Sequence, residues 1–138
     1  MTSFSDDIVA LIVAAGAGVF AGSTRDLFIS TKSQVPEKGG PYTTITDTNG
    51  SGDDYIQNQD EPDEEHPTAQ LRVRDPNYQI AMAKAMQLRA LLVKVHNTTV
   101  GTTFYLKIRG LGNIGDGGLD DSERAQVIFN IMGDRQPA

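Results

Sequence analysis

The glycines at positions 110, 112 and 115 form the clearest chemical motif of the sequence, because their spacing is G-x-G-x-x-G. This pattern binds the pyrophosphate of a dinucleotide when it follows a strand and opens a helix. Here it follows a strand pattern, but Asp116, Gly117 and Gly118 come next and the following apolar segment alternates as another strand. The helical half of the motif is missing, so we expect no nucleotide cofactor at these glycines.

A second pattern is that of a calcium loop. Asp47, Asn49, Ser51 and Gly52 occupy the first, third, fifth and sixth positions of an EF-hand-like loop, whereas the twelfth position is Asn58. That position needs an acid that binds calcium with both oxygens, and no helix pattern flanks the loop. The chain has no cysteine, which excludes thiolate metal sites, thiolate nucleophiles and disulfides. We therefore expect no metal.

The histidines offer little catalytic chemistry. His66 lies in an acidic segment, and His96 ends a helix pattern, where a cation suits the helix dipole. The sequence has no G-x-S-x-G element that would place a serine nucleophile for acyl transfer. These observations predict a protein that is not an enzyme, with no catalytic residues and no required cofactor.

Charged residues provide the candidates for an interaction surface. Residues 49–67 change to glycine, amide and acidic side chains, which predicts a long acidic loop; loops of this length are often functional. Two later strand patterns place basic side chains on their exposed face. Contact of such a basic stripe with the acidic loop, within one copy or between copies, would orient association; the alternative is a solvated loop and a solvated sheet face. The candidate interface residues are Asp60, Glu61, Asp63, Glu64, Glu65, Arg72, Arg74, Lys107 and Arg109.

The elements that carry these residues fit a single α+β domain covering residues 1–138. Ser5 is the expected N-cap of a first helix that ends at Gly16 or Gly18. Asp75 and Pro76 open the longest helix, which ends near His96. Strands are expected at residues 27–29, 42–48, 69–74, 104–109 and 125–131, with residues 110–121 as a link. The order α-β-β-β-α-β-β predicts a mostly antiparallel sheet packed against two helices.

Alternation and helical spacing also predict which side chains are buried. In the strands, one set of apolar residues alternates with polar or basic ones, and in the long helix the apolar residues recur every three or four positions. The expected core positions are Leu71, Val73, Phe104, Leu106 and Ile108 in the strands and Tyr78, Ala81, Ala85, Leu88, Leu92 and Val95 in the helix.

The overall charge limits the partners. At 138 residues and a formal net charge of −6, the chain does not favour tight binding to nucleic acid, whose backbone is itself negative.

The apolar stretch of residues 8–20 is too short to span a bilayer and follows two acids where a signal peptide would carry Lys or Arg. We therefore expect no membrane partner.

Several segments follow one another in a recognisable order along the chain: a short N-terminal helix, a Gly-Pro-Tyr strand entry, a polar acidic loop, and residues 66–74 (HPTAQLRVR) leading into an alanine-rich helix. Residues 101–106 (GTTFYL) and 119–124 (LDDSER) complete the pattern. In this order the segments resemble the tail terminator and minor capsid (tail completion) proteins of long-tailed bacteriophages. The similarity covers most of the chain.

The resemblance implies a structural virion protein of the tail or neck, made in the cytoplasm of the bacterial host. It implies a homo-oligomeric ring, usually a hexamer, that caps the tail tube and joins it to the head-side connector. Its partners would be further copies of itself, the tail tube protein and connector proteins, with DNA passing through the ring without tight binding. A head-completion (neck) protein is a related alternative; a small-ligand-binding enzyme and an acidic host-directed decoy are alternatives of other classes.

Overall fold

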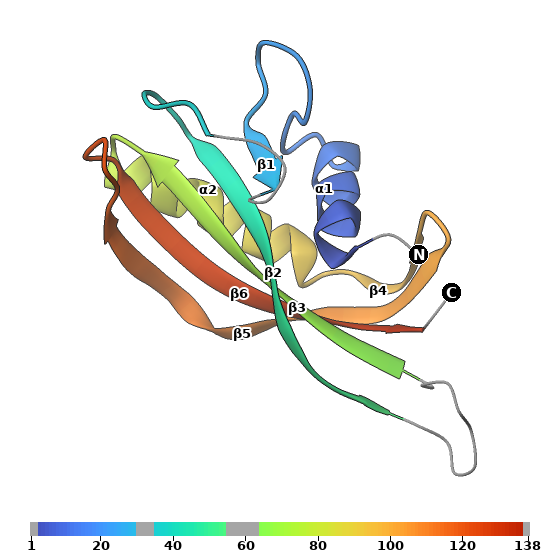
Figure 1. Cartoon of the computed structure of the whole chain (residues 1–138). Coiled ribbons are helices and arrows are strands. Elements are labelled where there is room, and N and C mark those ends of the chain that lie inside the picture. The colour runs from blue at the N-terminus through green and yellow to red at the C-terminus, as the bar shows by residue number, and fades with distance from the viewer. Residues whose placement is uncertain (1–2, 30–34, 55–63, 137–138) are drawn as a thin grey trace.

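The computed structural model describes residues 3–29, 35–54 and 64–136. Within these ranges the chain forms two helices and six strands, with both helices on one face of a strongly curved sheet (Figure 1). The α+β class with two helices is as predicted. The elements in chain order are α1 (Phe4–Ala14), β1 (Leu27–Ile29), β2 (Tyr42–Asp54), β3 (Glu64–Asp75), α2 (Tyr78–Leu92), β4 (His96–Val100), β5 (Thr103–Leu119) and β6 (Ala125–Gln136).

The described strands form one sheet in the order β1-β2-β3-β6-β5-β4. β1 pairs with β2 in parallel, whereas all other neighbours are antiparallel. The sheet is therefore mixed, and the predicted strand order was incomplete because it omitted β4. β4 is polar, with sequence HNTTV, and gave no apolar alternation; the turn after Val100 folds β5 back beside it.

The core lies between the sheet and the two helices. α2 buries Ala81, Ala85, Leu88 and Leu92, as its spacing predicted, while Tyr78 is 42% exposed and is not part of the core. The small alanines let the helix approach the sheet closely. The fully buried side chains from the sheet include Ile45, Leu71, Val73, Phe129 and Ile131.

Both helices begin two residues away from the positions predicted. Ser3, not Ser5, is the N-cap of α1 and accepts a hydrogen bond from the backbone N–H of Asp6. Ser5 instead donates its hydroxyl to Asp47 of β2, at 2.7 Å. Asn77, not Asp75, caps α2, and Asp75 accepts the backbone N–H of Asn77 at 2.7 Å. Asp75 thus satisfies a backbone donor close to the start of α2, while Asp47 accepts the backbone N–H of Ser5 at 3.0 Å.

The β2–β3 hairpin replaces much of the predicted loop. β2 continues to Asp54 and β3 begins at Glu64, so the hairpin extends beyond the helices as an arm (Figure 1). β6 pairs with β3 as far as Glu65↔Arg135, and the hydroxyls of Thr48 and Thr68 lie 2.6 Å apart across the hairpin. The composition of this segment predicted a loop because it lacks an apolar face, but pairing of backbone groups needs no apolar side chains.

β5 also differs from its prediction. It runs to Leu119, so the expected link at residues 110–121 is mostly strand. A register shift between Tyr105 and Lys107 brings both Tyr105 and Ile108 onto the core face, whereas Phe104 and Leu106 are only half-buried. An inserted residue of this kind reverses which side chains face the core. Strict alternation cannot anticipate it.

Candidate functional site

The predicted basic stripe is divided between the two ends of β6. Arg72 donates from Nη1 to Oε1 of Gln126 at 2.7 Å, near the start of β6. Arg109 donates from Nη2 to Oδ1 of Asp134 at 3.1 Å, near its end. Lys107 is exposed and opposite Asp134 in the strand register. The structure thus separates Arg72 and Arg74 from Lys107 and Arg109.

Two of the five predicted acidic interface residues have partners within the chain. Glu65 accepts hydrogen bonds from Nε and Nη2 of Arg135, both at 3.2 Å. Glu64 places an oxygen 4.0 Å from Nδ1 of His66. Asp60, Glu61 and Asp63 lie outside the described residues.

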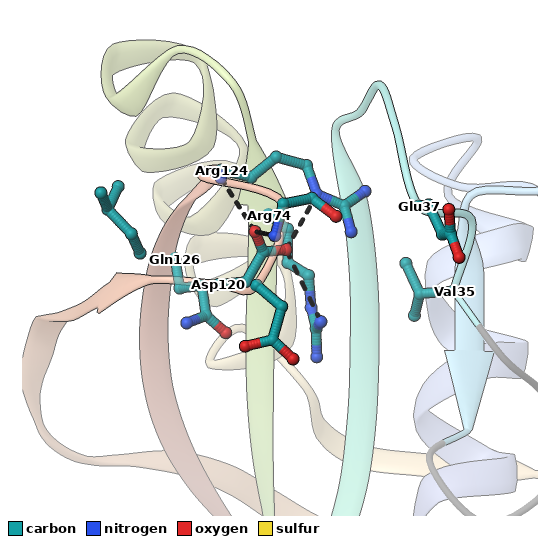
Figure 2. A pocket seen from close by; sticks show the side chains of 9 residues that line it. Val35, Glu37, Arg74, Asp120, Arg124 and Gln126 are labelled. Atoms are coloured by element: carbon teal, nitrogen blue, oxygen red, sulfur yellow. Dashed lines mark hydrogen bonds and ion pairs between the residues drawn. The ribbon is translucent and has the colours of Figure 1, made fainter.

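A polar cavity of about 650 Å³ lies where β3 ends and the β5–β6 turn begins (Figure 2). Arg124 makes several hydrogen bonds in this cavity, and its side chain is only 5% exposed. It donates to Asp120, to the carbonyl of Pro36 at 2.8 Å and to the carbonyl of Gly39 at 3.3 Å. Arg124 therefore fastens the β5–β6 turn to the chain before β2. The cavity is lined by Val35, Glu37, Arg74, Leu119, Asp120, Asp121, Ser122, Arg124 and Gln126.

The charges in this cavity nearly balance. Arg74 has its nearest ion-pair partner, Asp120, at 3.8 Å, and its buried Nε has no hydrogen-bond partner among the described residues. Burial and the neighbouring charge of Arg72 lower the pKa of Arg74. Burial acts to raise the pKa of Asp120, but hydrogen bonds from the backbone and side chain of Arg124 outweigh it and lower that pKa. Because Glu37 and Asp121 also line the cavity, it is not a strong site for an anion.

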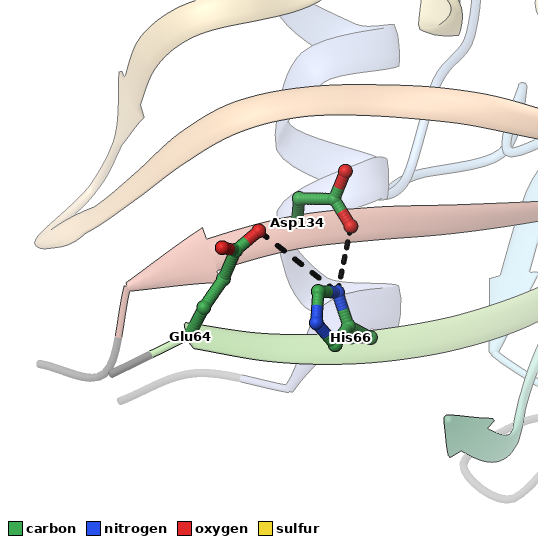
Figure 3. Close-up of side chains that lie close together, drawn as sticks. All are labelled: Glu64, His66 and Asp134. Carbon is green, nitrogen blue, oxygen red and sulfur yellow. Dashed lines mark hydrogen bonds and ion pairs between the residues drawn. The ribbon is translucent and has the colours of Figure 1, made fainter. Parts of the chain in front are cut away.

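His66 joins the base of the hairpin arm to β6 (Figure 3). Its Nδ1 lies 2.7 Å from Oδ1 of Asp134, a residue that is 3% exposed, and 4.0 Å from an oxygen of Glu64. The three residues have ligand types suited to a metal ion, and their ligand atoms lie within 4.8 Å of one another. Arg109, however, donates to the same Asp134 oxygen at 3.1 Å, and its positive charge opposes a cation there. The cluster is better explained as a tie between β3 and β6.

A second polar cluster attaches α1 to the sheet. The hydroxyl of Tyr105 donates to Asp7 of α1 and accepts from Nη1 of Arg135 at 3.4 Å. Burial and the hydrogen bond to Asp7 raise the pKa of Tyr105. Arg135 continues the cluster to Glu65. Sequence reasoning missed both clusters because their members lie on elements that are far apart in the sequence and meet only in the folded chain.

The two cofactor-like motifs have structural explanations. Gly110, Gly112 and Gly115 all lie within β5 and do not open a helix. A side chain at Gly110 would collide with the guanidinium of Arg89, which donates to the carbonyl of Gly112 at 3.0 Å. Asp47 of the calcium-like pattern accepts hydrogen bonds from Ser5. Gly110 makes room for Arg89 of α2, and Asp47 fixes the start of α1.

Comparison with known proteins agrees with this structural reading. The family described as bacteriophage tail terminator protein matches residues 12–131, which is most of the chain. This chain belongs to the bacteriophage tail terminator family. The family is structural, and membership places the protein in the tail of the phage virion. No curated protein matches the sequence.

Solved structures share the fold of this tail terminator family member. One, titled "Virion of native gene transfer agent (GTA) particle", has a TM-score of 0.66 at 11% identity and covers 98% of this chain and 96% of the other. A second solved structure has a TM-score of 0.59 at 17% identity, with 99% of each chain covered. Among the described residues, neither helix is long and apolar enough to cross a membrane.

Proposed function

We propose that this protein is a tail terminator that assembles into a closed ring, of six copies, on the end of the tail tube. The ring stops growth of the tube and provides the joint to the head-side connector, with DNA passing through it. The observation that carries this proposal is the family match over residues 12–131. A head-to-tail contact between identical subunits gives a ring when the rotation between them closes.

A role without catalysis or a cofactor is part of the proposal. It is supported by the structural roles of the residues that resembled catalytic or ligand-binding motifs. Gly110 makes room for Arg89, Asp47 binds Ser5, and His66 bonds to Asp134. Each of these residues contributes to packing or to strand attachment.

We further propose that Asp60, Glu61 and Asp63, which precede β3 in the sequence, contact basic residues of a neighbouring copy. Glu64 and Glu65 are left out of this proposed contact because they have partners in their own chain. Glu65 accepts a hydrogen bond from Arg135, and Glu64 lies beside His66. Arg72 and Arg74 are the expected counterparts. They lie near the start of β6, whereas the arm base lies near its end, opposite Arg135. The base of the arm thus lies away from Arg72 and Arg74 of its own copy, so we expect these arginines to meet the acids of a neighbouring copy.

Electron microscopy of the purified protein, alone and mixed with tail tubes that lack a terminator, tests the main proposal. The expected result is a ring at one end of each tube, with tubes of uniform length when the protein is present during assembly. Binding to head-side connectors without binding to tubes would indicate a head-completion protein instead. A single copy per tail, or a continuous filament, would refute the ring.

The arm is tested by replacing Asp60, Glu61 and Asp63 with Ser or Asn. We expect an unchanged melting temperature and weaker assembly, with the defect clearest at low salt because screening is then weak. The matched control replaces Glu64 and Glu65, whose partners lie in the same chain; it should lower the stability of the monomer instead. Equal tube capping by the first variant and the parent across salt concentrations would show that the arm acids are only solvated.

A further inference from the structure

The outer surface of α2 is unusual for a helix on the surface of a protein. Such helices normally carry charged or polar residues on their exposed face. The charged residues within α2 are Lys84 and Arg89, and both reach back to carbonyls of the chain, of Ala17 and Gly112 respectively. The exposed face is therefore uncharged along the helix and includes Tyr78, Gln79, Ile80, Ala83, Met86, Gln87 and Ala90.

This face continues into an apolar groove between α2 and β5. The groove has a volume of about 310 Å³, and its exposed large apolar side chains are Met86, at 57%, and Val93, at 38%. Exposed apolar patches with a polar rim commonly mark sites of protein association. The lining residues are Met86, Arg89, Ala90, Val93 and Ile114.

An exposed apolar side chain that could fill such a groove, Leu119, lies at the end of β5. Leu119 is 69% exposed, more than any other large apolar residue that the structure describes. It ends β5 and precedes a turn closed by hydrogen bonds between the backbones of Asp120 and Arg124 at 2.9 Å and of Glu123 and Asp120 at 3.0 Å. Leu119 is thus held outward on an ordered turn, and its exposure shows that it does not fill the groove of its own subunit.

The charges around the two features are complementary. Leu119 has exposed acids on both sides in the sequence, namely Asp116, Asp121 and Glu123. The groove is bordered by Arg89, and Lys94 is exposed just beyond the end of α2. Complementary charges at the rim of an apolar contact orient the partners and disfavour other arrangements.

We propose that Leu119 of one copy inserts into the α2–β5 groove of the next copy, with the acids around Leu119 facing Arg89 and Lys94. This inference rests on the proposed ring and names the contact that builds it. The contact is head-to-tail, as the proposed ring requires: Leu119 lies on one side of each joint and the groove on the other. Each copy then has one donor end and one acceptor end, and a closed ring uses both ends of every copy.

Two substitutions remove the two sides of the contact separately. Ala90→Glu places a charge in the groove at an exposed helix position, and Leu119→Ser removes the inserting side chain. Ala10→Glu, at an exposed alanine of α1, is the matched control. Sedimentation velocity and electron microscopy of free protein and of capped tubes should show the first two variants folded but needing at least about tenfold more protein for half-assembly, as for a central interface residue. The control should assemble like the parent.

Mixing the two variants provides a sharper test. The Ala90→Glu protein keeps Leu119, and the Leu119→Ser protein keeps the groove, so one joint between them remains intact. The mixture should form dimers and no closed rings, while each variant alone stays monomeric. If the parent forms rings and both variants form them equally well, or if Ala10→Glu is equally defective, this contact is wrong although the ring stands. If the parent itself forms no ring, free or on tubes, the proposed function fails.

Discussion

Gly133 is a position at which one added methyl group should disturb the packing of α1 against the sheet. A Cβ there would lie 2.8 Å from Cε1 and 3.1 Å from Cζ of Phe4, and 3.1 Å from Cε1 of Tyr105. Both rings are almost fully buried, with their centroids 5.9 Å apart, so neither can move into solvent. Gly133 does not have a positive φ, so the cost of Gly133→Ala is steric. Overpacking of this kind costs about 1–3 kcal/mol.

The prediction is measured as a loss of melting temperature and of unfolding free energy in urea. For a domain of this length, about 1–3 kcal/mol corresponds to a decrease of about 3–12 °C. Gly115→Ala is the matched control, because Gly115 lies in the same sheet and an added Cβ would meet only the carbonyl oxygen of Ile128, at 4.0 Å. This control should change stability by less than about 0.5 kcal/mol.

A third variant separates steric overlap from other effects. Phe4→Leu shortens the ring that meets the new methyl group, so adding it to Gly133→Ala should cost less than the sum of the two single changes. If Gly133→Ala melts within a degree or two of Gly115→Ala, the close approach of Phe4 and Gly133 is wrong. If the double variant is strictly additive, Phe4 is not the group that resists the methyl.

Three further outcomes are expected. Tyr105→Phe removes the hydroxyl between Asp7 and Arg135 and should lower the unfolding free energy in urea by about 1–3 kcal/mol; no change would contradict the cluster. The pKa of Asp120 is lowered on folding, so ionised Asp120 stabilises the fold above its unfolded pKa of 3.8. This stabilisation is lost as the pH falls through the lowered pKa. Asp120→Asn should therefore flatten the acid dependence of the unfolding free energy measured from about pH 6 to pH 2. Nucleotides and calcium should leave the melting temperature unchanged, because only ligands that bind the native state raise it; a shift of several degrees would overturn this.

Local patterns in the sequence predicted the parts of the fold that depend on one element at a time. The spacing of Ala81, Ala85, Leu88 and Leu92 gave the buried face of α2, and the alternation around Leu71 and Val73 gave the core face of β3. In both elements the apolar residues recur with the period of the element, and the face that they form is the face that packs against the core. Periodicity is most reliable under those conditions.

Features that depend on pairing between elements were not predictable in this way. The arm strands carry no apolar pattern and are defined by backbone pairing with each other and with β6. The insertion near Leu106 and the parallel pairing of β1 also depend on neighbours distant in sequence. The same limit applies to the candidate sites: His66 with Asp134, and Arg124 with the carbonyl of Pro36, are brought together by sheet order.

The position of β6 also constrains the order in which the protein folds. β6 follows every other described strand in the chain, yet it lies between β3 and β5 in the sheet. Until it is in place, β1, β2 and β3 form one group and β4 and β5 another, with no strand to join them. Contacts of such long sequence separation slow folding, because chain entropy is lost before they form. The chain therefore exposes one unpaired edge of β3 and one of β5 until β6 is synthesised, and the sheet is complete only when this last strand has been inserted between them.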